Sequence, residues 1–282
     1  MFIKIKLLAK KTILNIFALL NKTKIGGYAF QQILNSAMDA TQSLTHNQTQ
    51  LLFSVPNRLN HFRVDSFSTK EPETLEWIDN FPPESVFWDI GANIGLYSCY
   101  AAKARNCKVF AFEPSVFNLE LLARNIYLNQ LTANVCIVPL PLSNDLCIST
   151  LNMTSKDWGG ALSTFGEDYG DDGKILNKIF EFRTLGMSMD LVSAILNIPI
   201  PSHIKIDVDG IEQLILSGGN NILSQVSEVL IEVNEDFVAQ HVNVERLLGN
   251  AGLVFMGKRH SAMYDNNLRF GNTYNQFWFR PE

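Results

Sequence analysis

The chain has 282 residues, of which 46% are hydrophobic and 18% charged, and its formal net charge is −5. This length can bury one substantial core and carry an appendage, and the composition is typical of a soluble globular protein. The acidic balance excludes a general nucleic-acid-binding surface, and four cysteines without C-x-x-C spacing exclude a disulfide framework, so we expect free thiols in a reducing, cytoplasmic compartment.

Residues 1–24 differ from the rest of the chain in charge. They contain six lysines and no acidic residue, and the lysines alternate with Ile, Leu and Phe. This pattern predicts a basic amphipathic helix, which either rests peripherally on an anionic membrane surface, packs on the following domain or stays a poorly ordered leader. The longest apolar patch, residues 13–20, is shorter than the roughly 20 residues that a transmembrane helix needs. No small-x-small cleavage site follows, which argues against a signal peptide.

Three further elements are predicted before the central part of the chain. Apolar spacing indicates a second helix within residues 25–50, and residues 51–64 predict a short hairpin or strand pair. Residues 71–79 predict a helix that is ended by a run of prolines. We therefore expect a mainly helical N-terminal extension over residues 1–70 and one domain over residues 71–282.

The stretch from residue 85 to residue 113 organises this domain. An apolar run reaches Asp89 and turns through Gly91 and Gly95 into a helix, and a second apolar run ends at Glu113. This order predicts a strand, a tight turn, a helix and a parallel strand, in which the glycines allow positive φ and close approach of a ligand. Glu113 stands about 20 residues past the glycines. Dinucleotide-binding folds place a carboxylate at this distance, where it accepts hydrogen bonds from the ribose hydroxyls.

The spacing at this turn is Asp89-x-Gly91-x-Asn93-x-Gly95 rather than G-x-G-x-x-G. The missing third glycine and the acid argue against a pyrophosphate, and hence against a nicotinamide-dependent oxidoreductase. Two carboxylates suit a ligand with an amine, a ribose and a positive centre. S-adenosylmethionine is such a ligand; a plain turn without a ligand is the alternative.

Strands and helices alternate after Glu113, which predicts an α/β fold with a parallel sheet and helices on both faces. A strand over residues 134–140 would present Leu142 and Ser143 to an adenine. Residues 147–152 predict an added strand. A polar, glycine-rich loop follows at residues 153–174.

Three aromatic residues stand in or near the polar part of this loop, namely Trp158, Phe165 and Tyr169. Long irregular loops inside a compact domain are usually functional or disordered. We expect this loop either to close over a substrate with an aromatic face suited to a sugar ring, or to be a mobile insertion.

A second strand, turn and helix follow at residues 202–217. Lys205, Asp207 and Asp209 would share one face if the strand stayed extended. Because ligands bind at the carboxyl ends of parallel strands, we expect these side chains beside the first turn. Asp207 and Asp209 are the candidate general bases, and Lys205 would position the substrate or lower a neighbour's pKa.

Two alternatives remain for this second turn. Lys205 and Glu212 would form an ion pair that only shapes the turn, or Asp207, Asp209 and Glu212 would bind a divalent metal; we assign no metal. Towards the C-terminus, strands over residues 253–256 and 274–280 are joined by a loop and predict an antiparallel hairpin at the sheet edge. His260 in that loop is the one histidine that we would test as a base.

Residues 71–280 resemble the FkbM family of S-adenosylmethionine-dependent O-methyltransferases. The resemblance rests on Asp89-Ile-Gly-Ala-Asn-Ile-Gly-Leu-Tyr-Ser, on Phe-Glu113-Pro and on Ile-Lys205-Ile-Asp-Val-Asp-Gly-Ile-Glu212. Members commonly carry Glu where Asp209 stands. The resemblance implies a class I methyltransferase fold, a Rossmann-like sheet of seven strands with the last antiparallel. It also implies methyl transfer to a hydroxyl, often on a sugar of a polysaccharide, glycolipid or secondary metabolite.

The predicted cofactor-binding residues are Asp89, Gly91, Asn93, Gly95, Glu113, Leu142 and Ser143. The predicted partner is a small-molecule or glycan substrate, with no nucleic acid. The alternative function is a non-catalytic module of the same fold that binds S-adenosylmethionine or a glycan.

Overall fold

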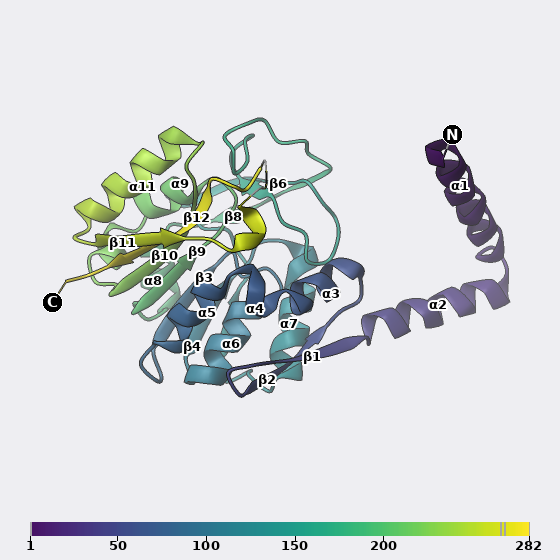
Figure 1. Cartoon of the computed structure of the whole chain (residues 1–282), viewed down its shortest axis with the longest axis horizontal. Helices are drawn as coiled ribbons and strands as arrows, with labels where there is room; N and C mark the ends of the chain where they lie inside the picture. The colour runs from purple at the N-terminus through teal and green to yellow at the C-terminus, as the bar shows by residue number, and fades with distance from the viewer. Residues whose placement is uncertain (1, 266, 268, 282) are drawn as a thin grey trace.

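The computed structural model describes residues 2–265, 267 and 269–281, and of residues 2–10 the backbone alone. Seven of the described strands form the central sheet, in the order β11-β12-β10-β9-β3-β4-β5 (Figure 1). Their bounds are β3 Val86–Ile90, β4 Lys108–Phe112, β5 Val135–Val138, β9 His203–Ile206, β10 Glu228–Asn234, β11 Val254–Arg259 and β12 Thr273–Phe279.

β12 is antiparallel to both of its neighbours, whereas β3, β4, β5, β9 and β10 pair in parallel. The predicted α/β sheet of seven strands with an antiparallel last strand is thus confirmed. The predicted hairpin of the last two strands, which has the short helix η1 (Ala262–Tyr264) in its loop, is confirmed as well.

Helices cover both faces of the sheet, as predicted (Figure 1). One face carries α5 Pro72–Asp79, α6 Leu96–Arg105 and α7 Val116–Leu128, and the other carries α8 Met189–Leu196, α9 Glu212–Ser217, α10 Asn220–Leu223 and α11 Val238–Asn250. Side chains alternate along a strand, so Phe87 and Val109 pack into the first layer while Trp88 and Phe110 pack into the second. Both faces of the parallel strands are therefore closed to water.

The added strand β6 (Cys147–Met153) belongs to a second, smaller sheet with β7 (Ser163–Phe165) and β8 (Phe180–Gly186), in the order β7-β6-β8. The long loop predicted at residues 153–174 is therefore interrupted by one strand. Because Phe165 is buried against the main core, the loop is fixed to the sheet on that side.

The predicted hairpin over residues 51–64 is wrong in its bounds. The hairpin consists of β1 (Thr41–His46) and β2 (Thr49–Ser54), and residues beyond Pro56 form α3 (Arg58–Asp65) and α4 (Phe67–Lys70). Asn47 and Gln48 form the turn with positive φ of 42° and 67°. α3 starts where it does because the side chain of Asn57 accepts a hydrogen bond from the backbone N–H of Asn60.

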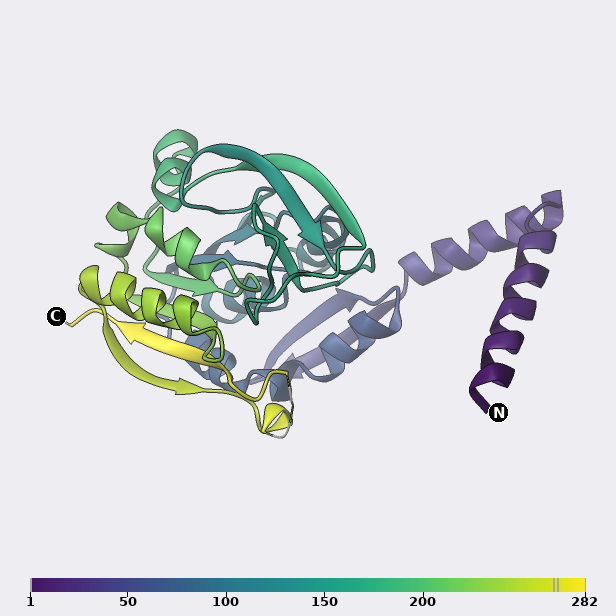
Figure 2. The same cartoon turned by 90° about the horizontal axis from the view of Figure 1, so that it is seen from above.

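Residues 41–70 share a core with the rest of the domain. Leu51, Phe53, Val55, Val64 and Phe67 are buried in the same cluster as residues of α6 and α7. The boundary at residue 70 stays a prediction, and the packing puts the change in environment before β1. Ahead of it, α1 (Phe2–Leu20) and α2 (Lys24–Met38) are helical, as predicted, and stand away from the body (Figures 1 and 2).

Candidate functional site

The carboxyl ends of β3, β4, β9 and β10 meet at one edge of the sheet. Ile90 of β3 is paired with Phe112 of β4 and with Ile206 of β9, and Ile206 is paired with Ile231 of β10. Ligands of open parallel sheets bind at this edge. The next residue of each strand is therefore presented there: Gly91, Glu113, Asp207 and Glu232. Two cavities open at this edge and share a wall formed by Gly91, Asn93, Ala161, Asp207 and Asp209.

The smaller cavity has a volume of about 70 Å³ and lies between the ends of β3 and β4. Gly91 has a φ of +88°, and a Cβ on it would lie 1.9 Å from the carbonyl oxygen of Asp207. A side chain cannot be accommodated there, so the close approach of the two turns requires glycine. Asn93 and Leu142 also line this cavity.

Glu113 lines the smaller cavity and is almost fully buried. Its Oε2 accepts a hydrogen bond from the backbone N–H of Asn93 at 2.8 Å, and its Oε1 accepts one from Ser115 at 2.7 Å. Burial raises the pKa of Glu113 to about 7, although both hydrogen bonds act in the opposite direction. A carboxylate offers about four acceptor positions, so Glu113 keeps capacity for the hydroxyl groups of a ligand.

Residues 159–163, which we call the closing loop, cover the wall between the cavities. The carbonyl oxygen of Gly160 accepts hydrogen bonds from the side-chain amides of Asn93 (2.8 Å) and Asn118 (3.1 Å). At the other end of the loop, Asp209 Oδ2 accepts hydrogen bonds from the backbone N–H groups of Leu162 (2.7 Å) and Ser163 (3.3 Å). The closing loop is therefore held by side chains from both glycine-containing turns.

The aromatic side chains expected to face a sugar from this region are directed elsewhere. The indole of Trp158 donates to the carboxylate of Glu120, and the ring of Tyr169 packs on Phe237 with 5.5 Å between centroids. Neither of these two side chains lines either of the two cavities, and Phe165 lines the smaller one. The expected aromatic face is therefore not formed by Trp158 and Tyr169, whose side chains have partners on neighbouring helices and loops, and only Phe165 of the three lies at a cavity.

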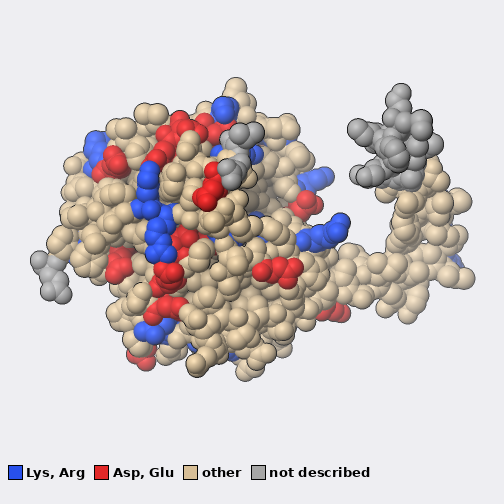
Figure 3. Space-filling view, in the orientation of Figure 1, with Lys and Arg blue, Asp and Glu red and all other residues tan. Residues whose placement is uncertain are grey.

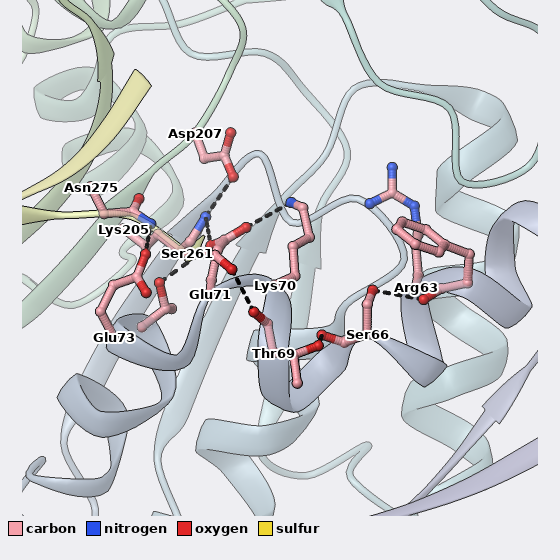
Figure 4. Close-up of polar contacts among 12 residues, drawn as sticks. Arg63, Ser66, Thr69, Lys70, Glu71, Glu73, Lys205, Asp207, Ser261 and Asn275 are labelled. Atoms are coloured by element: carbon pink, nitrogen blue, oxygen red, sulfur yellow. Dashed lines mark hydrogen bonds and ion pairs between the residues drawn. The ribbon is translucent and has the colours of Figure 1, made fainter. Parts of the chain in front are cut away.

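The larger cavity has a volume of about 300 Å³, and charged groups of alternating sign line it. Lys205 Nζ lies 2.7 Å from Asp207 Oδ2 and 3.9 Å from Glu71 Oε2, and Lys70 Nζ lies 2.7 Å from Glu71 Oε1 (Figure 4). The ammonium of Lys205 also lies 5.1 Å from the centroid of the Tyr97 ring. These contacts form a continuous chain of ion pairs that ends at Asp207, on the wall shared with the smaller cavity.

The electrostatics of this chain favour the charged forms of Glu71 and Lys205. Burial acts to raise the pKa of Glu71, but Lys70 and Lys205 outweigh it and lower that pKa to about 2. Burial acts to lower the pKa of Lys205, but Asp207 and Glu71 outweigh it and raise it. Glu232 has no ion pair among the described residues, and burial together with Asp207 and Glu71 raises its pKa well above the usual range.

Asp209 differs from Asp207 in its surroundings. The strand β9 ends at Ile206, and Asp209 has a φ of +64°, so the extended face predicted for Lys205, Asp207 and Asp209 ends before its last member. Burial and the neighbouring charge of Asp207 raise the pKa of Asp209 to about 7. The carboxylate of Asp209 accepts hydrogen bonds from the closing loop, whereas the carboxylate of Asp207 accepts one from the ammonium of Lys205.

Three predicted cofactor residues line neither cavity. Asp89 is buried and accepts a hydrogen bond from the hydroxyl of Ser98. Gly95 precedes α6 with a φ of +81°, and the backbone N–H of Ser143 donates to Met187. The other four, Gly91, Asn93, Glu113 and Leu142, line the smaller cavity, as do Asp207 and Asp209, while Lys205 lines the larger one.

The predicted ion pair between Lys205 and Glu212 does not form. Glu212 accepts hydrogen bonds from the backbone N–H groups of Val208 and Gly210 and from the side chain of Gln240. Glu212 and Asp209 are also not in the group of described acidic residues whose oxygens lie close enough to share a metal ion with Asp207. The described acidic groups that come within 4.8 Å of one another are Glu71, Asp207 and Glu232. Ammonium groups of the chain already supply the positive charge among them.

Sequence reasoning missed the part of the site that precedes the first core strand. Arg63 lines the larger cavity from α3, Lys70 from the end of α4 and Glu71 from the residue before α5. Tyr97 and Tyr264 line it from α6 and η1. Glu232, which also lines this cavity, offered a signal, because it is an acidic residue near the carboxyl end of a core strand. His260 also lines this cavity, and its ring stacks on Tyr274 at 4.5 Å.

The chain is similar to one protein family and to two methyltransferases of known name. The family profile described as "Methyltransferase FkbM domain" matches residues 89–255. The chain is 28% identical to the hexuronic acid methyltransferase AglP of Haloferax volcanii over 60% of this chain and 64% of that protein. It is 38% identical to the methyltransferase sdnD of Sordaria araneosa over 31% of this chain and 37% of that protein. The matches thus span less than two thirds of either relative.

Solved structures of comparable fold include the following one. It belongs to a protein of Streptococcus mutans assigned to the S-adenosylmethionine-dependent methyltransferases, with a TM-score of 0.50 and 10% identity, over 85% of this chain and 55% of that one. At this identity the likeness concerns the fold alone.

Proposed function

The chain belongs to the FkbM-domain methyltransferases, with the class I methyltransferase fold, and we propose that it transfers the methyl group of S-adenosylmethionine to a hydroxyl of a sugar. The observation that carries this proposal is the wall of five residues shared by two cavities, across which a methyl group could pass. The sugar is supported by the name of the relative AglP, a hexuronic acid methyltransferase. The acceptor would be part of a polysaccharide, glycolipid or secondary metabolite.

The residues that line the smaller cavity suit S-adenosylmethionine, the cofactor of this family and fold, although the cavity itself is too small to hold it without a movement of the closing loop. Gly91 leaves the turn without a Cβ, and Glu113 keeps free acceptor capacity for ribose hydroxyls. We propose that Gly91, Asn93, Glu113 and Leu142 contact the cofactor. Asp89, Gly95 and Ser143, which line neither cavity, would instead stabilise the conformation of the turns. Ligand pockets usually measure about 300 Å³ or more, so the closing loop has to release Asn93 and Asn118 before the cofactor enters the cavity of about 70 Å³.

Within this proposal Asp207 receives the proton of the acceptor hydroxyl. Its Oδ2 is held by Lys205, and no hydrogen bond of Oδ1 occurs among the described residues, which leaves one oxygen for the acceptor. When bound, the cofactor would supply an electrophilic methyl group, which would move to the hydroxyl oxygen with the carbon–sulfur electron pair left on sulfur. Asp207 would hold this hydroxyl and take up its proton. Alignment of the reacting atoms contributes several kcal/mol, and the base about 10²–10⁴-fold.

Asp209 stays the second candidate base. Its two backbone hydrogen bonds favour a role in holding the closing loop over the reacting groups. Lys205 would position Asp207, because its ammonium is fixed between two carboxylates.

The test uses the full chain with S-adenosylmethionine labelled in its methyl group and a panel of nucleotide sugars, uronic acids and glycolipids. We expect label in one sugar class and formation of S-adenosylhomocysteine. The same assay with Asp207→Asn should lose transfer while a thermal shift with S-adenosylhomocysteine persists. Binding without transfer to any acceptor would favour the non-catalytic module instead.

We further propose that the protein works in the cytoplasm, on a small-molecule or glycan substrate rather than a nucleic acid. Its four cysteines, all in the described part of the chain, are free, which agrees with a reducing compartment. Within the described residues no helix is long and apolar enough to cross a bilayer. Residues 1–24 are proposed to meet a membrane surface peripherally.

A further inference from the structure

The helices α1 and α2 carry apolar side chains that the rest of the molecule leaves uncovered. In α1, Ile13, Ile16, Phe17 and Leu20 recur at helical spacing and are each 44–53% exposed. In α2, Phe30, Ile33, Leu34 and Ala37 repeat the same spacing, and no residue of this helix is buried. Uncovered apolar stripes of this kind mark a surface that binds a partner.

The two helices form one arm. The side chain of Thr23 caps α2 by accepting the backbone N–H of Gly26, and the rings of Phe17 and Phe30 lie 5.4 Å apart, so the two stripes are continuous at the elbow. Figures 1 and 2 show the arm standing away from the body, with α2 leading directly into β1. The body therefore does not cover these stripes.

The charge of the arm favours an anionic lipid surface over a second copy of the chain as the partner. Residues 1–38 contain six lysines and no acidic residue, so removing them from the net charge of −5 leaves −11 on the rest of the chain. In Figure 3 charged side chains of both signs crowd the body, whereas the visible described part of the arm is mostly uncharged. A second copy would bring two lysine-rich arms together, whereas an anionic lipid surface complements both the lysines and the apolar stripes.

One part of the lining of the larger cavity lies near the arm. Leu59 and Phe62 of α3 line that cavity and are also solvent-exposed, and both views place α3 at the root of the arm. An arm lying on a bilayer would thus bring an apolar lip close to the lipid, next to the opening that admits the acceptor.

From these observations we propose that α1 and α2 bind flat on an anionic bilayer and that the acceptor sugar is carried by a lipid of that bilayer. The second half rests on the proposed function, because it names the acceptor of the same site. The first half is independent of any catalysis. It extends the membrane contact from residues 1–24 to α2, through Ile33 and Leu34.

Vesicle flotation tests the first half. The full chain is mixed with vesicles of phosphatidylcholine alone or with phosphatidylglycerol, and compared with Ile33→Asp/Leu34→Asp and with the matched control Gln31→Asp/Gln32→Asp. The control adds the same two charges at polar residues of α2 that lie outside the apolar stripe. All four side chains are exposed, so the fold should persist, which a thermal shift with S-adenosylhomocysteine checks.

We expect binding to the anionic vesicles, a loss of at least about tenfold for the apolar-face variant, and at most about threefold for the control. Equal binding to neutral vesicles, no binding, or equal loss for both variants would overturn the proposal. So would light scattering that shows a dimer broken by the apolar-face variant, because the partner would then be a second copy.

The acceptor half is tested by methyl transfer to glucuronosyl diacylglycerol in anionic vesicles and to free glucuronic acid. Transfer to the lipid form that falls with the apolar-face variant supports it. Transfer only to the free sugar refutes it and leaves the proposed function standing. Vesicle binding without any transfer to these or to the wider acceptor panel removes the proposed function and leaves the bilayer contact in place.

Discussion

Replacing Glu71 with Gln should destabilise the protein in a way that depends on pH. The buried carboxylate lies between Lys70 and Lys205, and its pKa is about 2 instead of the ordinary 4.5. At about 1.36 kcal/mol per pKa unit, this difference corresponds to roughly 3 kcal/mol of stability at neutral pH. Because the folded pKa is the lower one, this contribution is complete above pH 4.5, about half remains at pH 3, and it disappears as the pH falls past about 2.

Urea unfolding of parent and Glu71→Gln proteins at several pH values between 7 and 3 measures this contribution. The matched control is Glu76→Gln in the same helix. Glu76 pairs with Arg259 at 2.5 Å, but both side chains are more than half exposed, so we expect a loss of at most about 1 kcal/mol. A difference for Glu71→Gln that is below 1 kcal/mol at pH 7, or that stays constant down to pH 3, would refute the account of the ion-pair chain.

Three further predictions concern the two cavities. Glu113→Ala should weaken S-adenosylmethionine binding by about tenfold to a hundredfold in calorimetry, since a charged acceptor contributes about 1.5–3 kcal/mol; unchanged affinity would exclude the ribose contact. Asp207→Asn should lower kcat by about 10²–10⁴-fold with little change in cofactor affinity, whereas parallel losses of both would assign Asp207 to the binding of the cofactor instead. Gly91→Ala should lower the melting temperature and abolish cofactor binding, because its Cβ would lie 1.9 Å from the carbonyl oxygen of Asp207; a variant that melts and binds like the parent would contradict the packing of the two turns.

Where local patterns decide the structure, the sequence was sufficient. The strand, turn and helix around Gly91 were predicted because apolar runs, glycines and the following helix are neighbours in the chain. The same holds for the antiparallel hairpin of the last two strands, whose connecting loop lacks a helical pattern.

The prediction was weakest where contacts join distant segments. Glu71 approaches Lys205 although more than 130 residues separate them in the chain, and the spacing of residues along the sequence does not predict such a contact. The hairpin was misplaced because residues 41–50 are polar on one side, while the apolar residues after Pro56 belong to a capped helix. The role of Asp209 followed from its positive φ, which a single sequence does not reveal.

The order of the last strands constrains how the protein is made. β12 is later in the chain than β11 yet lies between β11 and β10, so β11 has no place in the sheet until β12 has been synthesised. Until then the nascent β10 presents an unpaired hydrogen-bonding edge, which is a hazard for association with other chains. The hairpin therefore has to dock as a unit late in biogenesis, and a stalled ribosome would expose an aggregation-prone intermediate.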